Sequence, residues 1–204
     1  MLQILAVALL SILSGVLLSS GAMSWPIRPG LVGCAALLVS AWAARRYWQG
    51  LRVEDGPGSP ERALWHGLAS FGLLFGHLSA TVWTLGPVLE MHSLAGHAMA
   101  LDNWTLVLGA VVSYAIARDP EPRHDERDAM IRAQGERVGH ATLLLLLLPL
   151  ILALGFGAHT MVGRANQPML AHVLILIVML RCLAQHIAQL RLYWLDTCAE
   201  RSAA

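Results

Sequence analysis

Long apolar stretches alternate with short polar ones along the whole chain. Each is close to the length of about 20 residues that a helix needs to cross roughly 30 Å of hydrocarbon. The pattern therefore predicts an all-α integral membrane bundle of about six transmembrane helices in one domain, 1–204. The predicted spans are 2–22, 30–47, 63–85, 98–117, 138–159 and 169–192.

The tryptophans support these boundaries independently of hydropathy. Amphipathic rings prefer the interface between membrane and water. Six of the seven Trp residues lie near the ends of the predicted spans: Trp25, Trp48, Trp65, Trp83, Trp104 and Trp194.

The arginines predict the orientation of the bundle. All 14 basic residues are Arg, and with six spans most of them fall on one side of the membrane. That side carries Arg45, Arg46, Arg52, Arg62, Arg118, Arg123, Arg127, Arg132, Arg137, Arg191 and Arg201. The opposite side carries only Arg28 and Arg164, while Arg181 lies within a span. Because positive charge accumulates on the inner side, both termini are expected in the cytoplasm of a bacterial inner membrane.

The first span has features of a secretory signal peptide, because residues 19–22 are small, as at a cleavage site. Its start carries no basic residue, and its apolar stretch is longer than a typical signal-peptide core. An uncleaved membrane helix is the favoured interpretation.

The segment 118–137 is predicted to be a charged cytoplasmic loop whose second half leads into the fifth span as a helix. Asp125 is a suitable N-cap, and Asp128 stands at the third helical position. Arg132 stands four residues after Asp128, which predicts an ion pair between the two. The segment is either a solvated helix or a docking surface for a partner, with these residues as candidates: Asp125, Glu126, Arg127 and Arg132.

The same segment resembles a known sequence pattern. Residues 125–139 read DERDAMIRAQGERVG, which is similar to the DER-x-x-x-I-x-x-R/A segment before a membrane helix in a group of small uncharacterised prokaryotic multi-pass proteins. That group often has four spans rather than six. The resemblance therefore implies a multi-pass membrane protein and no particular activity.

Composition excludes several classes of protein. Hydrophobic residues make up 56% of the chain and charged residues 13%, against roughly 25% in soluble domains. A formal net charge of +1 gives no basis for nucleic-acid binding. The three cysteines show no paired spacing, so neither a disulfide framework nor a zinc site is predicted. No Ser/His/Asp or paired-carboxylate arrangement is placed plausibly, so catalysis is not expected.

Two predicted spans carry polar faces, which is unusual in a lipid environment. The third also contains Gly72 and Gly76 in a GxxxG pattern that permits close helix approach. Its polar residues are His66, Ser70, His77, Thr81 and Thr84. Those of the sixth span are His172, Arg181, Gln185, His186 and Gln189, with Arg181 and Gln185 well inside the membrane.

Histidine depth suggests a haem alternative. His172 and His186 are fourteen residues apart, about 40° from eclipsed on a helix. On the third span, His77 is expected at the depth of His172, and His66 at the depth of His186. Imidazole is an axial ligand of haem b. No second helix repeats the fourteen-residue spacing.

The outer connections suggest a metal alternative. They bring imidazole and thioether groups, which suit a copper or zinc ion, to one face. The candidate ligands are His92, His97, His159 and His172, without a strict ligand spacing.

Three functions remain open from sequence alone. The favoured one is a non-enzymatic accessory or regulatory membrane protein, which sits in the lipid bilayer and contacts a membrane or cytoplasmic protein. The second is a redox protein with haem or a metal ion, and the third is a small-solute transporter lined by the two polar faces.

Overall fold

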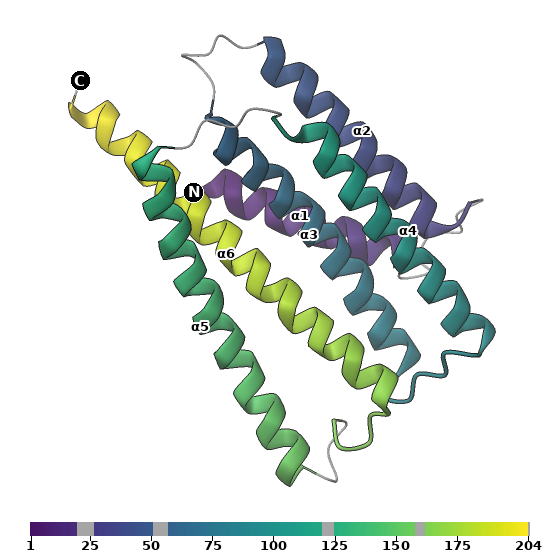
Figure 1. Cartoon of the computed structure of the whole chain (residues 1–204). Helices are drawn as coiled ribbons and strands as arrows, with labels where there is room; N and C mark the ends of the chain where they lie inside the picture. The colour runs from purple at the N-terminus through teal and green to yellow at the C-terminus, as the bar shows by residue number, and fades with distance from the viewer. Residues whose placement is uncertain (20–26, 51–56, 120–124, 158–161, 204) are drawn as a thin grey trace.

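The computed structural model describes residues 1–19, 27–50, 57–119, 125–157 and 162–203. This part of the chain forms six α-helices and contains no strand, so the prediction of an all-α bundle is confirmed. The helices are α1 Leu2–Ser19, α2 Pro29–Gly50, α3 Ser59–Leu85, α4 Leu94–Ala117, α5 Glu126–Phe156 and α6 Gln167–Ala203 (Figure 1).

Five of these helices, all but α2, are long and apolar enough to cross a membrane. Helix α2 has 22 residues, which is sufficient length, but its last turns carry Arg45 and Arg46. Its composition is therefore too polar to identify it as a span, which corrects the expectation that all six stretches qualify on hydropathy.

Several helices extend beyond the apolar stretches that predict them. Helix α4 begins four residues before the predicted span, and α6 continues to Ala203 instead of ending at 192. Helix α5 begins at Glu126, directly after the predicted N-cap Asp125, so the second half of the charged segment 118–137 is helix as predicted. Hydropathy marks only the lipid-facing part of a helix, whereas capping decides where the helix begins.

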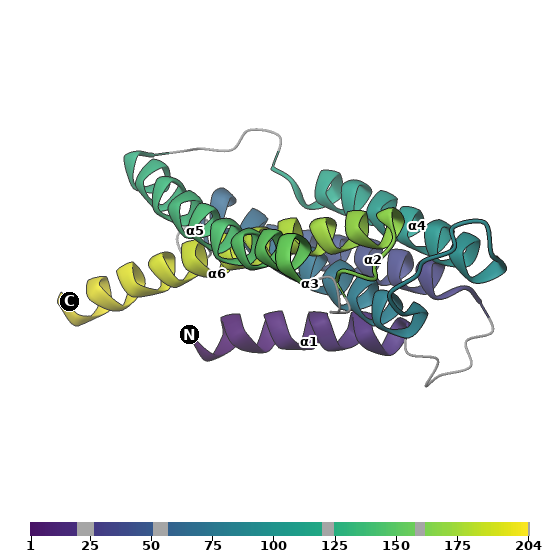
Figure 2. The same ribbon diagram turned by 90° about the horizontal axis from the view of Figure 1, so that it is seen from below.

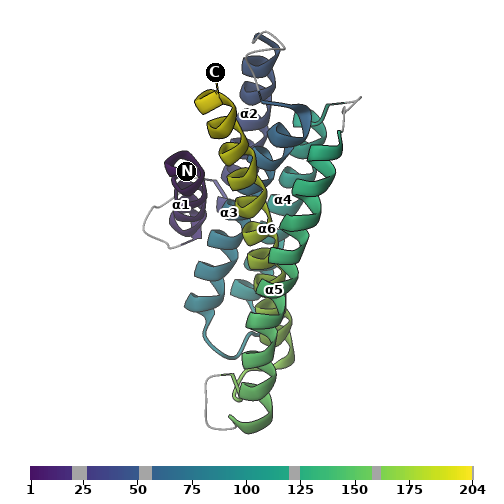
Figure 3. The ribbon, with the colours of Figure 1, turned by 90° about the vertical axis from the view of Figure 1, so that its left-hand side faces the viewer.

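Helix α3 lies at the centre of the bundle and contacts α1, α4 and α6. Helix α2 packs mainly on α4, and α5 packs on α6, on opposite sides of α3 (Figure 1). Helix α1 forms a separate layer and is inclined to the other helices (Figures 2 and 3). The pairs α1–α3 and α2–α4 therefore interleave along the chain, whereas α5 and α6 are consecutive.

Glycines bring α1 and α3 into backbone contact. A Cβ atom on Gly76 would collide with the carbonyl oxygen of Ile12, and one on Gly72 would collide with the Ser11 hydroxyl. From the other side, a Cβ on Gly15 would collide with the backbone of α3. The GxxxG pattern of α3 is thus confirmed as a close helix contact.

Helices α2 and α4 run side by side in the same direction, from Asp102 to the end of α4. Near the start of α2, Arg28 Nε lies 3.4 Å from Oδ1 of Asp102. Near its end, Arg45 Nη1 donates to the carbonyl oxygen of Ile116 at 3.0 Å. The two contacts are separated by most of α4, so α2 follows α4 from Asp102 to its last turn.

Candidate functional site: a polar pocket at the arginine-rich end

At one end of the bundle α2 and α4 end while α3 and α5 begin. We call it the arginine-rich end, because it carries Arg45, Arg46, Arg62, Arg118, Arg127, Arg132 and Arg137. The candidate site is a pocket at this end.

Helix α5 starts with a complete capping box. The side chain of Asp125 accepts from the backbone N–H of Asp128 at 2.8 Å. In return, Oδ2 of Asp128 accepts from the N–H of Asp125 at 3.2 Å. This confirms the sequence-based prediction of the cap and gives the charged segment a fixed helical start.

A group of four side chains, which we call the α5–α6 clamp, holds this start against α6. The Tyr193 hydroxyl donates to Oδ1 of Asp128. Nε of Arg127 donates to Oδ2 of Asp196 at 3.0 Å, and its guanidinium lies 5.6 Å from the centre of the Tyr193 ring. The predicted ion pair between Asp128 and Arg132 is wrong, because the Asp128 carboxylate is occupied by Tyr193 and by the cap.

Two turns further along α5 from the clamp, glycines of α5 pack against the polar face of α6. A Cβ on Gly135 would collide with the Gln189 side chain, and one on Gly139 would lie 3.3 Å from both Arg181 Nε and Gln185 Oε1. Sequence reasoning missed this contact, although residues 135–139 read GERVG, a second GxxxG pattern.

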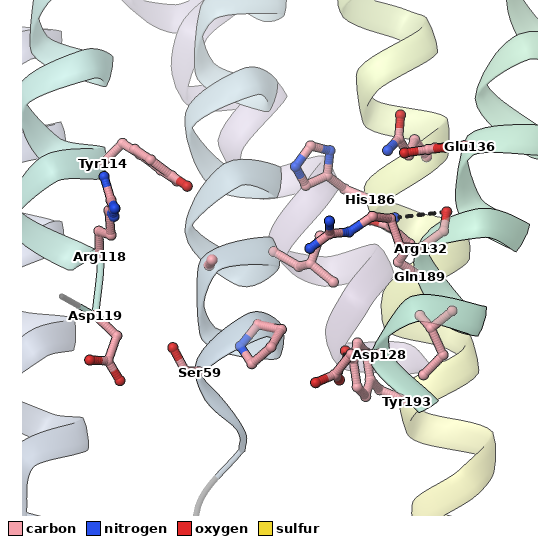
Figure 4. A pocket seen from close by; sticks show the side chains of 15 residues that line it. Ser59, Tyr114, Arg118, Asp119, Asp128, Arg132, Glu136, His186, Gln189 and Tyr193 are labelled. Atoms are coloured by element: carbon pink, nitrogen blue, oxygen red, sulfur yellow. Dashed lines mark hydrogen bonds between the residues drawn. The ribbon is translucent and has the colours of Figure 1, made fainter. Parts of the chain in front are cut away.

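A pocket of about 400 Å³ lies between α3, α4, α5 and α6 at the arginine-rich end. Figure 4 shows Tyr114 of α4 and Arg118, the residue after α4, on one wall and Arg132 of α5 extending from the other. It is lined by Ser59, Pro60, Ala63, Leu64, Tyr114, Arg118, Asp119, Asp128, Ile131, Arg132, Glu136, Gln185, His186, Gln189 and Tyr193.

Several polar groups in this pocket have no partner among the described residues. The guanidinium groups of Arg118 and Arg132 make no hydrogen bond or ion pair there, and neither does the carboxylate of Glu136. The side-chain amide of Gln185 is also unpaired within this part of the chain. Sequence reasoning missed Arg118 and Glu136, because only the fold places them opposite each other.

His186 reaches the pocket from α6. Its Nδ1 lies 2.6 Å from the carbonyl oxygen of Cys182, and since a carbonyl only accepts, Nδ1 carries the proton of this bond. The ring lies 5.5 Å from that of Phe71, and its Nε2 lies against Gly67, where a Cβ would come within 2.5 Å. Glycine at 67 is what lets the imidazole approach α3.

The other three haem candidates have separate partners, two on neighbouring helices and one within its own helix. The Nε2 of His66 is 2.9 Å from the Ser113 hydroxyl of α4, and Nδ1 of His77 is 2.5 Å from the Ser19 hydroxyl of α1. The Nε2 of His77 is buried without a partner in the described residues. His172, at the start of α6, bonds through Nδ1 to the carbonyl of its own helix at residue 168.

The metal candidates are only partly brought together. The rings of His92 and His97 are 6.4 Å apart, while His172 is engaged as above and His159 lies outside the described residues. Among the residues that the structure describes, no group of three or more His, Cys, Asp or Glu side chains has metal-binding proximity.

The remaining candidates are Arg181 and the residues predicted to contact a partner; some of them make contacts within the protein and others are exposed. Arg181 is half-buried beside Gly139, and its Nη1 lies 4.0 Å from the sulfur of Cys182. Of the partner-loop residues, Asp125 caps α5, Arg127 belongs to the clamp, and Arg132 lines the pocket. Glu126 is exposed.

No family model, curated protein or solved structure matches this chain.

Proposed function

We propose that the protein is a non-enzymatic accessory or regulatory component of a bacterial inner membrane, and that the exposed start of α5 contacts a partner protein. The observation that carries this proposal is the α5–α6 clamp, which holds a charged segment as a fixed helix. Glu126, Met130 and Arg137 are exposed on it. A surface that is already ordered loses less entropy on binding than a flexible loop does.

The proposal includes α2 as the sixth crossing, so that the arginine-rich end and both termini face the cytoplasm. Its parallel course along α4 supports this, because a helix that follows most of a spanning helix in the same direction covers a similar depth. An odd number of crossings would divide the arginines between the two sides.

Thiol labelling in intact cells tests the orientation. The native Cys198 is exposed near the C-terminus, and His92→Cys places a thiol in the exposed connection between α3 and α4. Each thiol is tested alone, in a chain whose other cysteines are replaced. An impermeant maleimide should label the thiol introduced at position 92 and spare Cys198 until the cells are opened. Labelling of Cys198 in intact cells would reject the orientation.

Site-specific photocrosslinking tests the partner contact. A photoreactive amino acid at Met130, which is 62% exposed, should form an adduct with a discrete protein in native membranes. The matched control is Leu145, which is 72% exposed on the apolar part of the same helix and should form no such adduct. Charge reversal at Glu126 and Arg137 should abolish the Met130 adduct. An adduct that survives reversal, or forms equally at Leu145, contradicts the proposal.

A further inference from the structure

The pocket at the arginine-rich end collects ionised side chains that the protein leaves unpaired among the described residues. Two are cationic, Arg118 just after α4 and Arg132 on α5, and one is anionic, Glu136 on α5. We infer that this pocket binds a phosphoethanolamine group, with the two guanidinium groups on the phosphodiester and the Glu136 carboxylate on the ammonium. The inference concerns a different surface from the partner contact and does not rest on it.

The phosphodiester half follows from the two arginines. A guanidinium offers planar pairs of N–H donors that match the oxygens of a phosphate, and two of them from opposite walls can hold one phosphate between α4 and α5. Figure 4 shows Arg118 and Arg132 on opposite sides of the pocket. The carboxylate of Asp128, which also lines the pocket, is held by Tyr193 and by the cap of α5.

The ammonium half follows from Glu136. It lies four residues after Arg132, hence about one turn further along the same face of α5. A purely anionic ligand on the arginines would place its charge near this carboxylate, which is unfavourable. A cation joined to the phosphate by a short link would reach the carboxylate and pair with it. The three unpaired side chains together therefore favour a zwitterion over either simple ion.

The position of the pocket favours a lipid as the source of this group. The pocket lies where the apolar parts of α4, α5 and α6 give way to charged residues, which is the level of the head groups in a bilayer. Its volume of about 400 Å³ is within the range of small-molecule sites. A water-soluble phosphoethanolamine ester has the same chemistry, so the experiment separates the two sources.

Thermal unfolding of the purified full chain in a non-ionic detergent tests the inference. The probes are dihexanoyl phosphatidylethanolamine, dihexanoyl phosphatidylglycerol and a soluble phosphoethanolamine diester, glycerophosphoethanolamine, each titrated to saturation. The ethanolamine lipid should raise Tm saturably and bind more tightly than the glycerol lipid. Equally tight binding of the soluble diester would support the site and assign a soluble source. No saturable effect of either ethanolamine compound would overturn the inference.

Variants then assign the roles of the three side chains. Arg118→Gln and Arg132→Gln should each weaken binding of the ethanolamine lipid at least about tenfold, since each loses a charge-assisted contact. The matched control is Arg137→Gln, an exposed arginine of α5 outside the pocket, which should bind as the native chain does. Glu136→Gln should remove the preference for ethanolamine over glycerol lipid. Equal losses in Arg137→Gln and Arg132→Gln, or a preference that survives Glu136→Gln, would overturn the assignment.

Discussion

The protein places polar side chains in two contrasting regions. In the contacts of α3 with α4 and α1, His66 meets Ser113 through Nε2 and His77 meets Ser19 through Nδ1, so one nitrogen of each imidazole is paired with a hydroxyl. In the pocket at the arginine-rich end, the ionised groups of Arg118 and Glu136 are left without a partner in the described chain.

The difference separates a structural role from a binding role. A buried polar group that is paired within the protein contributes to the contact between helices, and removing its partner is costly. An ionised group on a pocket wall that has no partner contributes little to folding, but it is free to bind something else. Four sets of substitutions test this contrast, beginning with the tightest contact.

The largest loss is expected for Gly76→Ala in the contact between α1 and α3. The added methyl group would meet the backbone of Ile12, which cannot move aside as a side chain does. Overpacking of this kind should cost about 3 kcal/mol, measured as a fall in Tm in detergent. Gly155→Ala is the control, because nothing lies within 4 Å of its Cβ. Equal Tm values for the two variants would contradict this packing.

A smaller loss is expected for Ser113→Ala. It removes the partner at 2.9 Å from Nε2 of His66, whose other contact, with Ser70, is 3.4 Å long. Leaving the imidazole poorly paired should cost about 2 kcal/mol in unfolding free energy. In the control, Ser40→Ala, the lost hydroxyl bonds only to a carbonyl of its own helix, so little change is expected. If both serines prove equally dispensable, the His66 contact is not structural.

The α5–α6 clamp should depend less strongly on one hydroxyl. Tyr193→Phe removes the hydrogen bond to the Asp128 carboxylate and should cost about 1.5 kcal/mol, read from chemical unfolding in detergent. Tyr114→Phe removes a hydroxyl in the pocket that has no partner in the described residues, and should be close to neutral. A larger cost for Tyr114→Phe would reverse the assignment of the two tyrosines.

The smallest effect on folding is expected in the pocket itself. Without added lipid, Arg118→Gln and Glu136→Gln should each change the free energy of unfolding by less than about 0.5 kcal/mol, because neither side chain is paired within the described chain. The measurement is unfolding of the delipidated protein. A loss as large as that of Ser113→Ala would show that these side chains are structural.

Features that depend on neighbouring residues could be predicted from the sequence. The lengths of the apolar stretches predicted the helices, and the spacing of Asp125 and Asp128 predicted the cap of α5. The GxxxG pattern of α3 indicated a close contact, though not that α1 supplies it. Helix α2 differs from the others, because Arg45 and Arg46 in its last turns lower its mean hydropathy although it packs along α4.

Features that depend on distant residues could not be predicted in this way. Asp128 has an arginine four residues away, yet it binds Tyr193, which is 65 residues away in sequence. The pocket is built from four helices, and no single segment carries its pattern. Helical spacing shows which residues share a face of one helix, but the neighbour that faces them is decided by the packing of the whole bundle.

The interleaved pairing of the first four helices has a consequence for biosynthesis. Helix α1 cannot reach its main partner until α3 has emerged from the ribosome, and α2 must wait in the same way for α4. Neither of the first two hairpins is therefore a stable unit when it enters the membrane. The last two helices, by contrast, can pair as soon as they are inserted. The nascent chain would be most exposed to quality control between α1 and α4, and a chaperone or insertase that shelters membrane helices would matter most there.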